Sequence, residues 1–168
     1  MAAQKLAHVE GLTMRRTDKL ITSPAGIDAI LKKAQTCHIA TAHGNHPYVV
    51  PFFYGYKNNI IYVHCATEGK MLKRLKDNPR VCIEVSLEVE IVPHPKPRHW
   101  TGKYRSVIGY GKAIVVANPK RKEEALDLIM RHYGSRFTAG GHPDATEAMR
   151  KTTVLQIQLK RVTGKASV

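Results

Sequence analysis

The stretch at positions 47–81, PYVVPFFYGYKNNIIYVHCATEGKMLKRLKDNPRV, decides how this chain is organised. Its first part, Tyr48–Tyr56, is rich in aromatic and β-branched residues, which predicts a strand. After a turn, Ile60–Cys65 predicts a second strand. A short basic helix is expected over Glu68–Lys76, ending at Asn78 because the residue before a proline avoids helical backbone angles. The order is therefore strand, turn, strand, short loop and helix.

The start of this helix carries Lys70 and Lys73. The free amides of a helix's first turn and the helix dipole both favour an anion, and the two lysines add positive charge. The layout predicts a site for a phosphate-bearing ligand. Single lysines on a surface helix usually contact only solvent. This alternative to phosphate binding stays open for both residues, and it is favoured for Lys73 more than for Lys70.

The flanking sequence extends the same pattern. Ser23 followed by Pro24 is typical of a helix start, and one apolar face predicts a helix over residues 24–35. Further elements are expected as an irregular arm at 1–22, strands at 37–42, 80–87, 104–117 and 152–162, a helix at 119–133, and loops at 92–99 and 134–148.

Together the expected elements amount to about six strands and three helices. Short connections between sequential strands favour antiparallel pairing. The chain contains no GxGxxG or Walker-type loop, so neither a Rossmann nor a P-loop site is expected. We predict a mainly β single domain over residues 1–168: a small antiparallel barrel, closed or partly open, with peripheral helices.

The cysteines and the N-terminal sequence bear on the cellular compartment. Cys37, Cys65 and Cys82 are widely spaced and form no CxxC pair, which argues against a disulfide framework or a zinc site. No signal peptide is visible at the N-terminus, and the uncharged residues 34–56 contain prolines and a turn rather than a membrane span. A cytoplasmic protein with reduced thiols and no resident metal is expected.

The formal net charge is +14, from 27 basic and 13 acidic residues. Such a balance can indicate nucleic acid, a membrane surface or small anions as partners. The basic residues are spread along the chain and do not interleave with the aromatic ones, so a single-stranded nucleic-acid interface ranks last. A small anionic ligand is favoured.

Several stretches, in this order, resemble the FMN-binding split-barrel superfamily of pyridoxamine 5'-phosphate oxidase. They are MRRTDKLI, CHIATAHGNHPYVVPFFYGY, IIYVHCATEGKMLKRLKDNPRVCIEV, YRSVIGYGKAIVV and VTGKA, spanning about residues 14–165. Within the superfamily the chain is most similar to the nitroimidazole-resistance (Nim) proteins. The resemblance implies a split barrel and a homodimer with two flavin sites in the clefts between the barrels.

The same resemblance implies which residues meet the cofactor. The strand carrying Val49, Val50, Pro51 and Phe52 would lie along the isoalloxazine ring and offer it backbone donors and acceptors. The remaining implied contacts lie near the phosphate, the ribityl chain or the ring, and they are His64, Cys65, Thr67, Lys70, Met71, Arg105 and Ser106. Arg105 has a dimer contact as its alternative role.

One position departs from the family pattern. Related proteins commonly carry Gly-Lys-Lys, whose second lysine aligns with a phosphate-contacting lysine of the oxidases, whereas this chain has Gly69-Lys70-Met71. Phosphate contact would then fall to Lys70, Lys73 or backbone amides, and the Met71 side chain itself is interpreted as a packing residue. The chain also shows no clear equivalent of the oxidases' C-terminal pyridoxal-phosphate determinants, so oxidation of pyridoxamine phosphate is not expected.

Two side chains have chemical alternatives. His64, at a strand end, is the candidate for a proton carrier near the flavin, against the alternative of a core histidine. Cys65 has no visible base beside it and is interpreted as a structural thiol.

These observations support three functions in descending order. The first is an FMN-dependent oxidoreductase of the Nim type, acting on small electron-poor compounds such as nitro-aromatics. The second is a non-catalytic protein of the same fold that stores or senses flavin, or holds haem through a histidine such as His64. A nucleic-acid-binding module comes third. FMN is the expected cofactor, with FAD and haem ranked below it.

Overall fold

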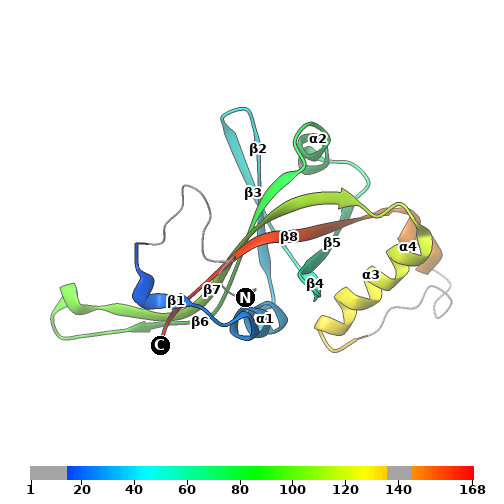
Figure 1. Ribbon diagram of the computed structural model, residues 1–168. Coiled ribbons are helices and arrows are strands. Elements are labelled where there is room, and N and C mark those ends of the chain that lie inside the picture. The colour runs from blue at the N-terminus through cyan, green and yellow to red at the C-terminus, as the bar shows by residue number, and fades with distance from the viewer. Residues whose placement is uncertain (1–14, 136–144) are drawn as a thin grey trace, which may run out of the picture.

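The computed structural model describes residues 15–135 and 145–168, and Figure 1 shows its elements. The helices and short 3-10 turns are η2 (Thr17–Lys19), α1 (Pro24–Lys33), α2 (Lys70–Asp77), η3 (Pro97–His99), α3 (Pro119–His132) and α4 (Ala145–Arg150). The strands are β1 (Leu20–Ile21), β2 (Cys37–His43), β3 (His46–Phe52), β4 (Tyr54–Lys57), β5 (Ile60–Ala66), β6 (Arg80–Val92), β7 (Thr101–Val115) and β8 (Thr152–Ser167).

All of these strands belong to one antiparallel sheet in the order β3-β2-β6-β7-β8-β5-β4, with β1 added to β8. The path begins at β3 and ends at β4, and among the described residues these two strands form no ladder with each other. The sheet is therefore strongly curved but not closed. The predicted antiparallel barrel with peripheral helices is confirmed in its partly open form.

The strand count differs from the prediction for two reasons. The strand expected over Tyr48–Tyr56 breaks at Phe53 into β3 and β4. Leu20 and Ile21, expected in an irregular arm, pair with Lys165 and Gly164 of β8. The sheet thus has eight strands rather than six.

One helix was also unexpected. The loop predicted over residues 134–148 contains the start of α4. Its positions 136–144, like 1–14 of the predicted arm, lie outside the described residues.

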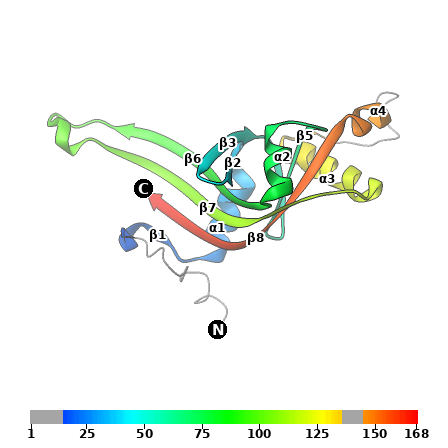
Figure 2. The same cartoon turned by 90° about the horizontal axis from the view of Figure 1, so that it is seen from above.

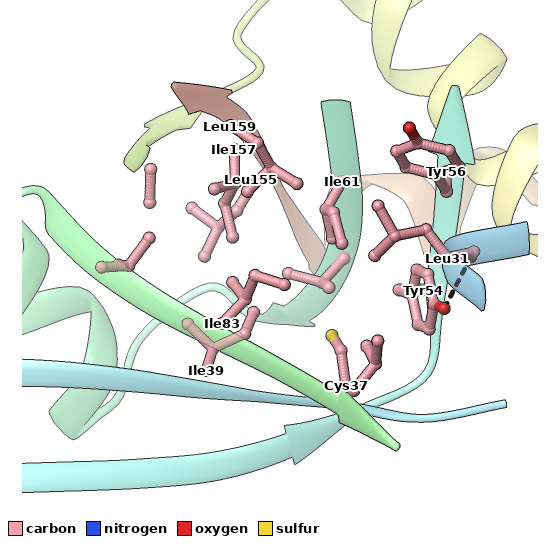
Figure 3. Packing of buried hydrophobic residues seen from close by; sticks show 14 of the residues in the cluster. Leu31, Cys37, Ile39, Tyr54, Tyr56, Ile61, Ile83, Leu155, Ile157 and Leu159 are labelled. Carbon is pink, nitrogen blue, oxygen red and sulfur yellow. Dashed lines mark hydrogen bonds between the residues drawn. The ribbon is translucent and has the colours of Figure 1, made fainter. Parts of the chain in front are cut away.

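The main core fills the inside of the curved sheet and is closed by α1 and α2 (Figure 3). Cys37 and Tyr54 are fully buried there, together with apolar side chains of β2, β5, β6 and β8. A smaller cluster, Ala125, Leu126, Ile129 and Val154, packs α3 against β8 and its neighbours. None of the helices in the described ranges is long and apolar enough to cross a membrane.

Strands β6 and β7 continue past the rest of the sheet as a two-stranded arm (Figure 1, Figure 2). The arm starts at a bulge between Leu87 and Glu90, where Glu88 has a φ of 57°. The arm carries Val89, Ile91 and Trp100, whose side chains are 70%, 63% and 56% exposed. The strand predicted to end at Leu87 is longer because it pairs with β7 as far as Val92.

Candidate functional site

Helix α2 lies beside the hairpin of β2 and β3 (Figure 1), and its first turn faces the start of β3. The Lys70 Nζ atom lies 4.9 Å from the centre of the Tyr48 ring, and the Arg74 guanidinium carbon lies 5.3 Å from the same point. A nitrogen of Arg74 also donates a 2.6 Å hydrogen bond to the His46 carbonyl. Two cations therefore meet one aromatic ring where β3 begins.

Within the described ranges, β3 is an edge strand whose one pairing partner is β2. Its side chains alternate: Val49 and Pro51 are exposed, whereas Val50 and Phe52 pack against the core. Because the second edge of β3 is unpaired in the sheet, its free N–H and C=O groups can bind a planar ligand. Pro51 contributes only a carbonyl, since proline lacks the N–H.

The end of β5 carries the next predicted residues. His64 is exposed and pairs with Val154 of β8, and it follows Val63, the partner of Tyr54 in β4. Cys65 is half-buried, and burial raises the pKa of its thiol above the usual value. A protonated thiol is a poor nucleophile, so the geometry favours a structural role for Cys65.

The residues around the start of α2 divide between two sides of the helix. Thr67, Gly69 and Lys73 line a cavity of about 480 Å³ between α2 and strands β7 and β8. Lys70 lies instead over Tyr48 of β3. The structure thus brings Lys70 to the predicted flavin strand and directs Lys73 elsewhere.

Met71 was among the implied cofactor contacts, but its side chain is only 7% exposed and belongs to the main core. The helix therefore uses this position for packing. A phosphate at the surface of α2 would meet its neighbours and not the Met71 side chain.

Arg105 and Ser106 lie on β7, away from α2. Ser106 pairs with Ser86 of β6 and Lys165 of β8, in a row of the sheet beyond the start of β2. The Arg105 side chain forms a 3.1 Å ion pair with Glu88 at the base of the arm. One chain alone does not bring these two residues to Lys70.

A second group of polar rings lies at the tip of the arm. The rings of His94 and His99 are 4.7 Å apart, and the Trp100 indole donates a 2.8 Å hydrogen bond to the His94 carbonyl. The part of the chain that the structure describes holds no cluster of three or more His, Cys, Asp or Glu side chains suited to a metal.

Sequence reasoning missed Tyr48 and Arg74 as site residues. Arg74 follows Lys70 by four positions, and this spacing places two side chains on the same face of a helix. That signal was available in the sequence. The position of Tyr48 under both cations was not, because it depends on how α2 docks on β3.

Comparison with known proteins identifies the family. The family model described as "Pyridoxamine 5'-phosphate oxidase" matches residues 23–166. The chain therefore belongs to the pyridoxamine 5'-phosphate oxidase family. Among curated proteins, no sequence matches it.

Solved structures give the same result. The chain is 31% identical to a Bacteroides thetaiotaomicron protein described as a candidate 5-nitroimidazole antibiotic resistance protein, with a TM-score of 0.74 over 87% of this chain and 85% of that chain. A flavocytochrome from Azotobacter vinelandii is 20% identical (TM-score 0.76; 96% and 73% covered). An FAD and haem binding protein from Mycobacterium smegmatis is 19% identical (TM-score 0.75; 89% and 73% covered). The last two similarities show the shared fold.

Proposed function

We propose that this protein binds a flavin, with FMN as the preferred form, along strand β3 and the first turn of α2. The observation that carries the proposal is the position of Lys70 over Tyr48, next to the unpaired edge of β3. A flavin needs a flat surface with backbone hydrogen-bonding groups for its ring and positive charge for its phosphate. The donor set of this site fits both needs.

The bound flavin would supply redox chemistry that no protein side chain provides. The chain's own residues bind, orient and shield it. Val49 and Pro51 cover one side of the ring site with apolar surface, and the β3 backbone fixes its edge. His64 is our candidate for holding or passing a proton, because an imidazole ring can both donate and accept a hydrogen bond.

We further propose that a second copy of the chain completes each site. Two apolar side chains on strands of the sheet, Val49 of β3 and Ile108 of β7, are 58% and 40% exposed. Exposed apolar side chains on a sheet face can become buried where two copies of a chain meet. Arg105 and Ser106 lie apart from Lys70 within one chain. In a dimer, the partner chain could bring its own copies of these two residues to the site. The proposed assembly is a homodimer with flavin at the interface.

The proposed reaction is reduction of small electron-poor compounds such as nitro-aromatics. It is supported by the 31% identity to the Bacteroides thetaiotaomicron protein, whose description concerns 5-nitroimidazole resistance. The three cysteines are free thiols, which suits a cytoplasmic location. A membrane or nucleic-acid partner has no part in this proposal.

A second candidate is a non-catalytic flavin or haem binder of the same fold. It is favoured by the similarity to the Azotobacter flavocytochrome and to the mycobacterial FAD and haem binding protein. It predicts tight cofactor binding without turnover by any reductant, or a Soret band after haem is added.

The first test is the absorbance spectrum of freshly purified protein, with any released chromophore identified by mass. Flavin bands with the mass of FMN would support the proposal, and the mass of FAD would correct the cofactor. Lys70→Ala should weaken FMN binding, whereas Lys57→Ala on β4 serves as the matched control. A colourless protein that does not bind added FMN would overturn the proposal.

A further inference from the structure

The two cations of α2 that face β3 form an unusual pair. Lys70 and Arg74 are one helical turn apart and converge on the Tyr48 ring at 4.9 Å and 5.3 Å. Both distances lie within the range of cation–π attraction, but like charges four residues apart repel each other. Among the residues that the structure describes, no carboxylate forms an ion pair with either cation. An anion placed between them would relieve this repulsion.

The Arg74 side chain is already fixed in a position where it could contact such an anion. It is only partly exposed, and one of its nitrogens is fixed by the 2.6 Å hydrogen bond to the His46 carbonyl. A guanidinium carries five N–H donors in a flat fork that matches phosphate geometry, so donors remain free. Fixing the side chain beforehand reduces the entropy lost on binding.

We propose that Arg74, together with Lys70, binds the phosphate of the flavin. Arg74 would thus take the role of the second lysine in the Gly-Lys-Lys pattern, where this chain has Met71. This inference rests on the proposed function and names a residue that the sequence analysis did not assign. From Tyr48 to Phe52 strand β3 covers about 13 Å, which separates a phosphate at its start from a ring along its end. Lys73 is not the substitute, because it lines the cavity on the other side of α2.

The test compares FMN with riboflavin, which has the same ring and ribityl chain but no phosphate. Both ligands are titrated into the wild-type protein and into Arg74→Ala, Arg74→Lys and Lys73→Ala, following flavin fluorescence and the melting temperature of each variant. We expect the wild-type protein to prefer FMN. Arg74→Ala should lower FMN affinity about tenfold or more and leave riboflavin affinity within about twofold. Arg74→Lys should restore part of the loss, and Lys73→Ala should match the wild type.

Other outcomes overturn the inference in distinguishable ways. If Arg74→Ala weakens FMN and riboflavin equally, Arg74 acts on the fold of the site and not on the phosphate. If Lys73→Ala gives the larger selective loss of FMN affinity, the phosphate lies in the cavity that Lys73 lines. If the wild-type protein binds both ligands equally well, the flavin function stands and this inference fails. If it binds neither, the proposed function itself is wrong.

Discussion

The hydroxyl of Tyr54 donates a 2.7 Å hydrogen bond to the Leu31 carbonyl, and both residues are fully buried (Figure 3). This bond ties the last turn of α1 to β4. In Tyr54→Phe the ring still fills its space, but the buried carbonyl loses its partner. We expect the free energy of unfolding to fall by about 1–3 kcal/mol, measured by urea titration. An unchanged unfolding midpoint would show that the carbonyl finds another donor.

Gly55 of β4 marks a close approach of α3. A Cβ atom there would lie 2.8 Å from the backbone nitrogen of Ile129, and backbone cannot move aside as a side chain can. We expect Gly55→Ala to destabilise the protein by about 1–3 kcal/mol or more. Gly102→Ala is the control, because its Cβ would lie 3.6 Å from the Glu90 carbonyl, an ordinary contact. Equal melting temperatures for Gly55→Ala and Gly102→Ala would contradict the close packing of α3 against β4.

Stability should decrease at alkaline pH. Burial raises the pKa of the Cys37 thiol from 9.0 to about 12, and burial with a hydrogen bond to Asp28 raises that of Tyr56 from 10.0 to about 12. Both groups are neutral when protonated, so above pH 9 the unfolded chain releases protons that the folded chain keeps. Their contribution is therefore intact below about pH 9 and is lost as the pH rises toward 12.

The measurement is the free energy of unfolding from pH 7 to 11, with tyrosine ionisation followed by absorbance. Alkylation of Cys37 should also be slow in the folded protein and fast after unfolding. A stability that rises from pH 9 to 11, or a Cys37 that reacts as fast folded as unfolded, would contradict these assignments.

The proposed dimer face can be tested at Ile108 of β7. A continuous row of residues crosses this face from one strand to the next, namely Pro51, His38, Glu84, Ile108 and Thr163. Ile108→Asp would place an unpaired charge in the contact, so we expect a shift from dimer to monomer in light scattering after gel filtration. Met130→Asp on α3 is matched in exposure, 38% against 40%, and should remain dimeric. A dimeric Ile108→Asp protein would place the interface elsewhere.

Local signals in the sequence were enough for most of the fold. The helices α1 and α3 start where predicted because Ser23 and Asn118 accept hydrogen bonds from the amides of Gly26 and Arg121. Such caps act within four residues and can be recognised in the sequence. Strand β1 was missed because two residues carry no periodicity, and their partner in β8 lies far along the chain.

The site was predictable only in part. The strand, loop and helix around Lys70 follow from local patterns, and the Lys70 ammonium lies over the Tyr48 ring of β3. The interpretation of Met71 as a packing residue agrees with its place in the main core. Arg105 and Ser106 were assigned by resemblance, and one chain leaves them apart from Lys70.

The pairing of strand β8 affects how the protein folds while the ribosome synthesises it. It pairs with β1, β5 and β7, and it is the only link between the β4–β5 hairpin and the rest of the sheet in the described chain. Every one of these partners is synthesised earlier. Until residues 152–167 have emerged, the hairpin can pack against α1 and α3 but cannot join the sheet, and β1 has no strand to pair with. The curved sheet therefore completes late, and part of its apolar surface stays exposed until then. Chaperone demand should therefore be highest before residues 152–167 have emerged from the ribosome.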